Sequence, residues 1–290
     1  MRINTPYWPL SALIVFALSS ICSLPVLAEP AISFWSGNRV EGRKLYERDV
    51  LDALLAATEQ EFGKRRVDEY TDDYPGLEEA EVFTSKGHDL FVTVAGNPKL
   101  AGRAKILVPE PIMKGLLGYR LLIVKSGDVA LFTDISPGEL AAKKVGIPET
   151  WADADLFRAN GYQVVEQGSF DTLMQRLANQ AFDYVSFGAN EIDSVFTQYA
   201  EPVGGLTIQP DLLLHYPFAL VFYLAPDQQT LARRLNLGFE RIRANGVLDA
   251  LFERYFGDIV EGQKLRERRT IHLDNPQMPA EMLTITEKIW

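Results

Sequence analysis

The clearest pattern of hydrophobic and polar positions lies between residues 143 and 191. Three short apolar runs alternate there with two segments whose apolar side chains recur at helical spacing. In chain order these pieces are residues 145–147, 150–160, 162–165, 169–177 and 183–187. The pattern predicts strand, helix, strand, helix, strand with short connections, which is typical of a parallel sheet covered by helices.

Apolar runs and amphipathic segments also occur on either side of this stretch. Expected strands lie at residues 31–37, 66–70, 89–96, 119–125 and 218–224, and expected helices at residues 43–62, 136–144, 227–244 and 247–256. Ser136 and Glu139 have the spacing of a capping box, which gives the second of these helices a defined start. We interpret the acidic segment at residues 71–83 as a solvated turn with a short helix, because its spacing fits no calcium loop.

Three blocks of sequence carry a resemblance to a known family. They are VGIPETWADADLFRANGYQVV, SFDTLMQRLANQAFDYV and FALVFYLAPDQQTLARRLNLGFERIRANGVLDALFERYFG. In this order they resemble the second lobe and C-terminal helices of bacterial extracellular solute-binding proteins of family 3, the periplasmic amino-acid-binding components of ABC importers. The resemblance covers about residues 30 to 258. It implies an α/β, two-lobed periplasmic-binding-protein fold of type II, in which each lobe is a mostly parallel sheet flanked by helices and two crossing strands form the hinge.

The resemblance also implies how the chain is divided. The expected pieces are lobe 1 at residues 29–118 and 217–258, lobe 2 at residues 119–216, and a tail at residues 259–290. The tail lies beyond the family's usual end. We expect it to pack on one lobe through Ile271, Leu273 and Trp290.

Residues 1–28 have the pattern of a secretory signal peptide, with Arg2 before an apolar core and small residues before Glu29. A membrane anchor is the weaker interpretation, because serine and proline interrupt the apolar core and no basic cluster follows it. Lipid attachment at Cys22 is disfavoured because the large Ile21 precedes it. We therefore expect a protein that is exported to the periplasm.

Composition narrows the range of partners. The chain is 47% hydrophobic and 23% charged, as an ordinary globular protein is, and its formal net charge is −10. Removal of the signal peptide takes away Arg2 and makes the charge −11, which argues against nucleic acid or anionic lipid as the main partner. It also removes Cys22, the single cysteine, so the mature protein relies on its core and not on disulfides.

Candidate ligand contacts in and beside lobe 1 are Trp35, Arg103 and Arg120. Trp35 ends the first expected strand, where it either faces the cleft or is a partly buried strand-end residue. By position Arg103 matches the arginine with which family 3 proteins clamp the ligand's carboxylate through two parallel hydrogen bonds. The family's accompanying threonine is absent, so an exposed loop arginine is the alternative. Arg120 starts the first crossing strand, where it either points into the cleft or flanks a hinge turn at Gly118.

In lobe 2 the candidate site loops follow two strand ends, because ligands of such sheets bind beyond the carboxyl ends of the strands. The Thr150 hydroxyl either caps a helix or binds the ligand, and Trp151 offers an apolar wall with one N–H donor. Where the family has an aspartate for the ligand's amino group, this chain has Gly188, and Glu191 is the nearest acidic substitute. Tyr216 precedes the return strand, within reach of the cleft.

No catalytic constellation is apparent. The mature chain lacks a cysteine nucleophile, a Gly-x-Ser-x-Gly elbow, a His-Glu-x-x-His zinc motif and a glycine-rich phosphate loop, so we expect no catalytic residue, metal or cofactor. Asp153 and Asp155 would repel a highly charged anion, which favours a zwitterionic, neutral or weakly acidic ligand. The leading hypothesis is a monomeric periplasmic solute-binding protein for an amino-acid-like molecule or small organic acid. Its partner would be a membrane protein, an ABC importer permease by resemblance.

Two alternatives stay open. An exported enzyme on the same scaffold, similar to the periplasmic cyclohexadienyl dehydratases, would use Glu191 or Glu110 as a general acid. A sensory or accessory binding protein would present its closed form to a receptor and not to a transporter.

Overall fold

The computed structural model describes residues 1–3 and 30–282. Most of the predicted signal peptide, including Cys22, and the predicted contact residue Trp290 lie outside the described residues. The chain divides into two units, Met1–Pro30 and Ala31–Trp290, and the elements given below belong to the second. Within the described ranges, no helix has the length and apolar character needed to cross a membrane.

The first sheet has the strand order β2-β1-β3-β11-β4. In chain order its strands are β1 (Ile32–Trp35), β2 (Val67–Tyr70), β3 (Leu90–Val94), β4 (Ile106–Val108) and β11 (Leu220–Leu224). β1 is parallel to β2 and β3, whereas β11 is antiparallel to β3 and β4. A late strand therefore returns into a sheet of early strands.

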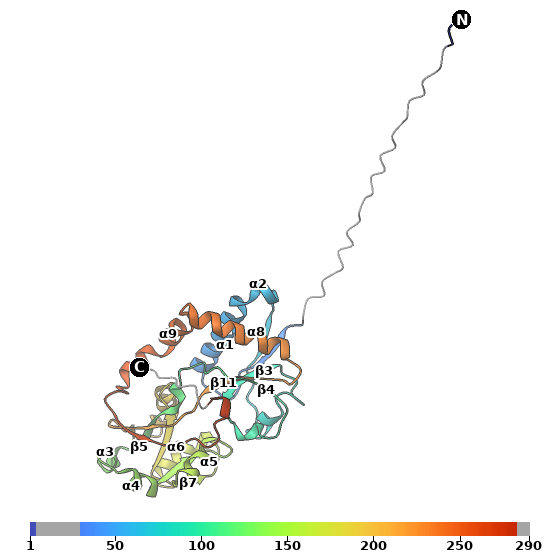
Figure 1. Ribbon diagram of the computed structural model, residues 1–290. Coiled ribbons are helices and arrows are strands. Elements are labelled where there is room, and N and C mark those ends of the chain that lie inside the picture. Colours follow the sequence, from blue (N-terminus) through green and yellow to red (C-terminus); the bar gives the residue numbers. More distant parts are fainter. Residues whose placement is uncertain (4–29, 283–290) are drawn as a thin grey trace. The chain divides into compact units, whose positions relative to one another are not determined.

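Helices cover one face of this sheet (Figure 1). They are α1 (Glu41–Ala57), α8 (Gln229–Ala244) and α9 (Val247–Gly262), and the short helix α2 (Glu59–Phe62) follows α1 directly. The apolar stripe predicted for the first helix is confirmed, because Tyr46, Val50 and Leu54 are fully buried. The single helix expected over residues 43–62 is instead two helices. The backbone leaves helical angles at Thr58, with φ −119° and ψ 11°, and the Thr58 hydroxyl donates to the Leu54 carbonyl at 2.8 Å.

The opposite face of the first sheet carries a smaller hydrophobic cluster. Its buried members include Trp35, Phe91, Val221 and Tyr223, and Met282 from the tail joins them. Two short 3-10 turns, η1 (Glu78–Glu81) and η2 (Pro98–Leu100), lie beside this cluster. Both faces of the first sheet are therefore covered. This keeps most apolar residues of its strands away from solvent.

One prediction for the acidic segment is wrong. Glu79, on η1, is buried and not solvated. Its carboxylate accepts hydrogen bonds from Lys99 Nζ at 2.7 Å and from the Asn97 amide at 3.2 Å. The ammonium group from η2 therefore compensates the Glu79 charge, a contact that the local sequence does not reveal.

The second sheet has the strand order β12-β10-β5-β8-β6-β7, and β9 pairs with β5. Its strands are β5 (Tyr119–Lys125), β6 (Lys144–Ile147), β7 (Gln163–Glu166), β8 (Tyr184–Gly188), β9 (Leu206–Ile208), β10 (Leu212–His215) and β12 (Arg269–His272). β6 is parallel to β7 and β8, so the strand and helix order predicted for residues 143–191 is confirmed. β5 is antiparallel to β8, β9 and β10, which makes the sheet mixed.

Short helices connect these strands (Figure 1). They are α3 (Ala130–Thr133), α4 (Pro137–Ala142), α5 (Asp153–Ala159), α6 (Phe170–Ala178) and α7 (Ile192–Val195). The capping box predicted for α4 is confirmed, because Ser136 and Glu139 exchange hydrogen bonds at 2.9 and 3.3 Å. α5 begins at Asp153 and not at Thr150. Thr150 has a left-handed φ of 70°, and its N–H donates to Glu166 Oε1 at 3.1 Å, so the backbone there is not helical.

The chain passes between the sheets at two adjacent places. Gly118 lies directly before β5, and Tyr216 lies directly after β10. The Tyr216 N–H donates to the Gly118 carbonyl at 3.2 Å. A Cβ on Gly118 would overlap the Tyr216 carbonyl, so the two crossings are in direct backbone contact. The strands expected near both crossings are present as β5 and β11. The lobe boundaries inferred from the resemblance stay a prediction.

The tail passes between the two sheets twice more, from α9 to β12 and then back toward Gly96. β12 pairs in parallel with β10 at the edge of the second sheet. Asp274 and Asn160 then exchange hydrogen bonds at 2.7 and 2.9 Å on the second-sheet side. Farther along, the Gln277 carbonyl packs on Gly96 beside the first sheet, and Met282 is buried there. The tail that we expected on one lobe thus reaches both sheets in its described part.

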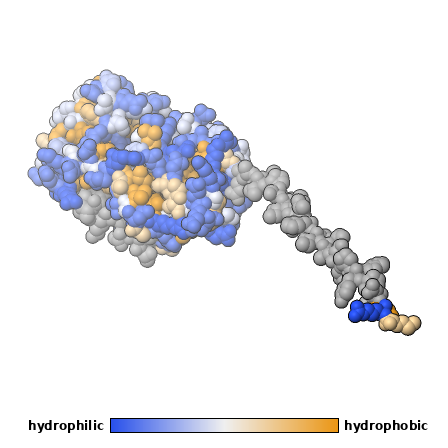
Figure 2. Space-filling model, turned by 90° about the horizontal axis from the view of Figure 1, so that it is seen from above, coloured by the Kyte–Doolittle hydropathy of each residue, from blue (hydrophilic) through white to orange (hydrophobic). Residues whose placement is uncertain are grey.

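The surface seen in Figure 2 is mostly hydrophilic, with a central group of hydrophobic residues. Among the described residues, Leu77 is a large apolar side chain that is 74% exposed, directly after the Pro75-Gly76 turn. Single exposed apolar residues of this kind are ordinary on protein surfaces.

Candidate functional site

Polar side chains converge at one end of the second sheet. Arg120 belongs to the start of β5, Asp153 starts α5, Asn190 and Glu191 follow β8, and Tyr216 follows β10. This end holds the carboxyl ends of the parallel strands β6 and β8, where ligands of such sheets bind. We call these residues the Arg120 cluster.

Arg120 lies at the centre of the cluster and is 2% exposed. Its Nη2 donates to Asp153 Oδ1 at 2.8 Å and to the Ser186 carbonyl at 3.2 Å, and its Nη1 donates to the Leu117 carbonyl at 3.3 Å. Glu191 Oε1 lies 4.0 Å from Nη1. Burial alone would lower the pKa of Arg120, but the neighbouring Asp153 carboxylate raises this pKa above its usual value. The guanidinium is therefore charged.

Tyr216 shares the Asp153 carboxylate with Arg120. Its hydroxyl donates to Asp153 Oδ1 at 2.6 Å, and its ring is fully buried against Phe157 and Phe218. Burial raises the pKa of the Tyr216 hydroxyl well above its usual value, so this group stays a donor at neutral pH. With one guanidinium and two carboxylates, those of Asp153 and Glu191, the cluster has an excess of negative charge.

Two side chains of the cluster have buried polar atoms without a hydrogen-bond partner among the described residues. They are Arg120 Nε and both amide atoms of Asn190. Asn190 is 8% exposed and packs against Gly188, where a Cβ would overlap Asn190 Oδ1 and the Leu117 side chain. A buried polar atom without a partner costs about 1–3 kcal/mol. These atoms therefore mark a place at which another molecule can supply the missing partners.

The chain is crowded at Gly188, where the resemblance implied an aspartate. An aspartate at this position would collide with Asn190 and Leu117. Glu191 Oε1 instead accepts the Gly188 N–H at 3.3 Å, which holds the carboxylate beside the glycine. Glu191, the acidic substitute expected from the sequence, thus lies next to Gly188, the position at which the aspartate was expected.

A small cavity adjoins the cluster. Its volume is about 10 Å³, and its lining includes Asp153, Ser186, Trp151 and Phe187. This is room for about one water molecule. Trp151 stacks on Phe170 with 6.0 Å between ring centres and meets the edge of Phe187 at the same separation, so its indole forms an apolar wall.

Thr150, directly before Trp151, is in contact with the first-sheet half. A Cβ on Gly76 would overlap Thr150 Oγ1, which places the Pro75-Gly76 turn of the first-sheet half directly on Thr150. Its hydroxyl caps no helix, because no side chain caps α5. The two halves of the Ala31–Trp290 unit are therefore in contact at Thr150, next to Trp151 of the cavity lining.

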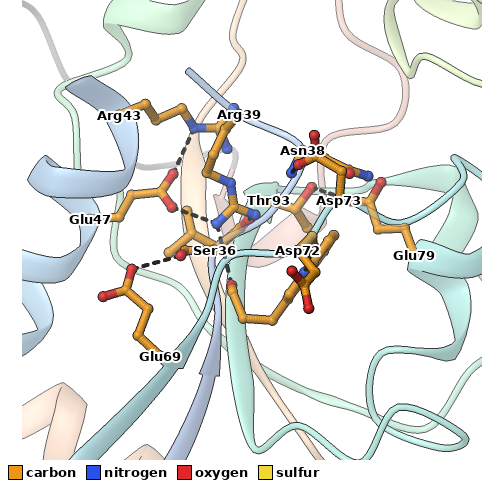
Figure 3. A network of polar contacts seen from close by, with 12 residues as sticks. Ser36, Asn38, Arg39, Arg43, Glu47, Glu69, Asp72, Asp73, Glu79 and Thr93 are labelled. Atoms are coloured by element: carbon orange, nitrogen blue, oxygen red, sulfur yellow. Dashed lines mark hydrogen bonds and ion pairs between the residues drawn. The ribbon is translucent and has the colours of Figure 1, made fainter. Parts of the chain in front are cut away.

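A second polar network lies at the carboxyl ends of β1 and β2 (Figure 3). Arg39 and Arg43 both point toward Glu47, with Arg39 Nη1 at 2.7 Å and Arg43 Nε at 2.6 Å from its carboxylate. Burial lowers the pKa of Arg39, although Glu47 acts in the opposite direction. Arg39 Nη2 also donates to the Val92 carbonyl at 2.9 Å, so this network ties α1 to the first sheet.

Trp35 belongs to the first-sheet half and is fully buried. Its Nε1 donates to the Asp72 carbonyl at 2.9 Å, and its indole stacks on Tyr74 with 4.9 Å between ring centres. Both the donor and the ring face of Trp35 are thus occupied by contacts within the chain.

Arg103 is separate from the Arg120 cluster. Its side chain is 43% exposed, on a turn after η2, and its guanidinium pairs with Glu81 at 2.8 Å. Of the residues that the sequence singled out, the structure brings together Arg120, Glu191 and Tyr216, with Trp151 beside them. Their roles as ligand contacts, and that of Arg103, stay predictions.

Sequence reasoning missed two members of the cluster. The sequence singled out Asp153 only as a carboxylate that would repel a highly charged anion, whereas the structure buries it as the shared acceptor of Arg120 and Tyr216. Asn190 had no sequence signal, since a single asparagine after a strand is an ordinary turn residue. In the described part of the chain, no group of three or more His, Cys, Asp or Glu side chains is arranged to hold a metal ion.

No protein-family model matches the chain, and no curated protein is significantly similar to it in sequence. Solved structures are similar in fold. The GluR0 ligand-binding core in complex with L-glutamate has a TM-score of 0.57 at 14% identity, covering 79% of this chain and 99% of that one. A periplasmic His/Glu/Gln/Arg/opine family-binding protein from Silicibacter pomeroyi, in complex with lysine, has a TM-score of 0.56 at 12% identity, with coverages of 79% and 98%.

A third similar structure is an amino acid ABC transporter substrate-binding protein from Streptococcus pneumoniae, bound to L-arginine. Its TM-score is 0.54 at 16% identity, with coverages of 80% and 96%. Together with the two mixed sheets, these likenesses show that the chain has the two-lobed α/β fold of type II periplasmic binding proteins. The fold predicted from the sequence is confirmed.

Proposed function

We propose that this protein is a solute-binding protein that captures a small polar ligand, amino-acid-like or a small organic acid, at the Arg120 cluster. The observation that carries this proposal is the set of buried polar atoms without partners on Arg120 and Asn190. A ligand that bonds to these atoms removes the cost of leaving them unpaired, whereas an apolar ligand does not. The fold supports the proposal, because the similar solved structures hold glutamate, lysine or arginine.

Ligand entry requires the two halves to separate. The cavity beside the cluster has a volume of about 10 Å³, which is too small for an amino acid. We expect hinge motion at the adjacent crossings near Gly118 and Tyr216, which breaks the contact between Gly76 and Thr150. The closed arrangement then forms around the ligand.

We further propose that the protein is exported to the periplasm, acts there as a monomer, and presents its closed form to a membrane partner. An ABC importer is the partner that suits this fold, and one of the similar structures is described as an ABC transporter substrate-binding protein. The apolar segment before Glu29 supports export, because it has the pattern of a signal peptide.

Thermal unfolding of the purified protein tests the proposal against amino acids, short peptides, organic acids and sugars. A ligand at about one hundred times its dissociation constant stabilises the fold by about 2.7 kcal/mol, which raises the midpoint measurably. We expect Glu191→Gln to weaken the binding of a cationic ligand. The matched exposed variant Glu201→Gln should bind as the wild type does.

Two further arms complete the test. Arg103→Ala decides whether Arg103 also contacts the ligand, and recovery of the bound compound chemically unchanged separates binding from catalysis. A panel without any stabilising compound would contradict the proposal. The proposal would also be contradicted if a stabilising compound bound to Glu191→Gln, and to the Arg120 cluster variants described below, as tightly as to the wild type.

A further inference from the structure

We propose that Asn190 selects ligands that carry a primary carboxamide over the corresponding carboxylates. The inference rests on the proposed function and narrows its ligand class to amino-acid-like amides. Asn190 lies in the turn between β8 and α7, directly before Glu191 in the sequence.

A comparison within the chain shows how unusual the surroundings of Asn190 are. Asn97 is buried to a similar extent, with 6% exposed against 8% for Asn190. The Asn97 amide donates to Thr93 Oγ1 at 2.9 Å, and its Oδ1 accepts the Lys99 N–H at 3.0 Å. Both amide atoms of Asn190 have no partner among the described residues. A buried asparagine with a structural role is normally paired as Asn97 is, so Asn190 is arranged for a partner from outside the chain.

The two residues of the cluster that carry these unpaired atoms, Arg120 and Asn190, both lie against Gly188. Arg120 lies directly opposite Gly188 in the β5–β8 ladder, and Asn190 Oδ1 occupies the space in which a Gly188 Cβ would lie. The site therefore presents two donors, Arg120 Nε and Asn190 Nδ2, and one acceptor, Asn190 Oδ1. All three are buried and uncommitted.

A primary carboxamide matches this set. Its carbonyl oxygen has two lone pairs, which accept from Asn190 Nδ2 and Arg120 Nε, and its NH₂ group donates to Asn190 Oδ1. A carboxylate has no proton for Asn190 Oδ1 and would add negative charge beside Glu191 and Asp153. An ammonium group would satisfy Oδ1 but would leave both donors unpaired. Of these three groups, the carboxamide alone pairs all three atoms.

Calorimetric titration of the wild type with glutamine against glutamate, and asparagine against aspartate, tests the inference. We expect at least one amide to bind at least about tenfold tighter than its acid, which corresponds to 1.4 kcal/mol. Asn190→Leu should weaken amide binding at least about tenfold and abolish the preference. Asn190→Asp should also abolish the preference, because it replaces the donor by a second acceptor and adds a charge.

A ligand-free readout separates recognition from a structural role. Asn190→Leu removes unpaired buried atoms, so its urea midpoint should equal or exceed that of the wild type. Asn97→Leu breaks satisfied hydrogen bonds and should lower the midpoint. A fall at Asn190→Leu as large as at Asn97→Leu would make Asn190 a structural residue and overturn the inference.

The outcomes also distinguish this inference from the proposed function. Binding of acids as tight as that of amides, or amide binding unchanged in Asn190→Leu, would reject the role of Asn190 while leaving solute binding in place. A wild type that binds no compound in the wider ligand panel would reject the proposed function and this inference together.

Discussion

The buried pair of Arg120 and Asp153 makes the sharpest prediction about stability. We expect Arg120→Met to lower the free energy of unfolding by about 4 kcal/mol, within the range of about 3–5 kcal/mol for removing one partner of a buried ion pair. The structural basis is specific. Asp153 would keep only the Tyr216 hydroxyl at 2.6 Å, and the Leu117 and Ser186 carbonyls would lose donors at 3.3 and 3.2 Å.

A double-mutant cycle separates the pair from the packing around it. Asp153→Leu alone should also be costly, because it leaves the Arg120 guanidinium, 2% exposed, without its carboxylate. Arg120→Met with Asp153→Leu removes both charges. The double variant should therefore be more stable, by about 2 kcal/mol, than the sum of the single losses implies. Urea unfolding followed by circular dichroism at pH 7 measures each free energy.

The control is a surface pair of similar composition. Arg158 is 46% exposed and pairs with Glu166 at 2.6 Å, so Arg158→Met should cost less than about 1 kcal/mol. Additive single losses at Arg120 and Asp153 would refute the reasoning. So would a loss at Arg120→Met as small as that at Arg158→Met.

Three further predictions concern the tail and its contacts. Gly96→Val should destabilise the fold by more than about 2 kcal/mol in urea unfolding, because φ at Gly96 is 78° and its Cβ would overlap the Gln277 carbonyl; no loss would mean that the tail does not pack there. Met282→Ala should cost about 2–3 kcal/mol if the tail is part of the core, and a neutral effect would contradict that packing. Burial and the nearby His272 lower the pKa of His215 to about 4 from its ordinary 6.5. As the pH falls, the unfolded chain therefore takes up a proton at His215 before the folded chain does. The free energy of unfolding should fall by about 1 kcal/mol, after allowance for partial exposure, as the pH drops from 6.5 toward 4. His215→Gln should show a smaller loss over the same pH range.

The sequence predicts the elements of this fold better than it predicts the site. Apolar runs in strands and apolar stripes in helices report burial directly, so the order of strands and helices between residues 143 and 191 follows from spacing alone. The start of α5 does not follow from spacing. The left-handed backbone at Thr150 is held by the carboxylate of Glu166, which lies at the end of β7.

The Arg120 cluster depends on contacts between distant positions. Asp153 and Tyr216 meet across 63 positions of sequence, and Arg120 and Asp153 across 33. Neither pair leaves a local pattern that spacing rules detect. Position in a family pattern also pointed to Arg103 as a clamp, and the structure holds that side chain in an exposed ion pair with Glu81.

A crystal structure grown with the best compound from the ligand screen tests most directly whether a small polar ligand occupies the Arg120 cluster. We predict ligand density between the two halves, within hydrogen-bond distance of Arg120 Nε and the Asn190 amide, with the Gly76 turn closed on Thr150. A ligand bound elsewhere on the protein, with these atoms still unpaired or bonded only to water, would contradict the account.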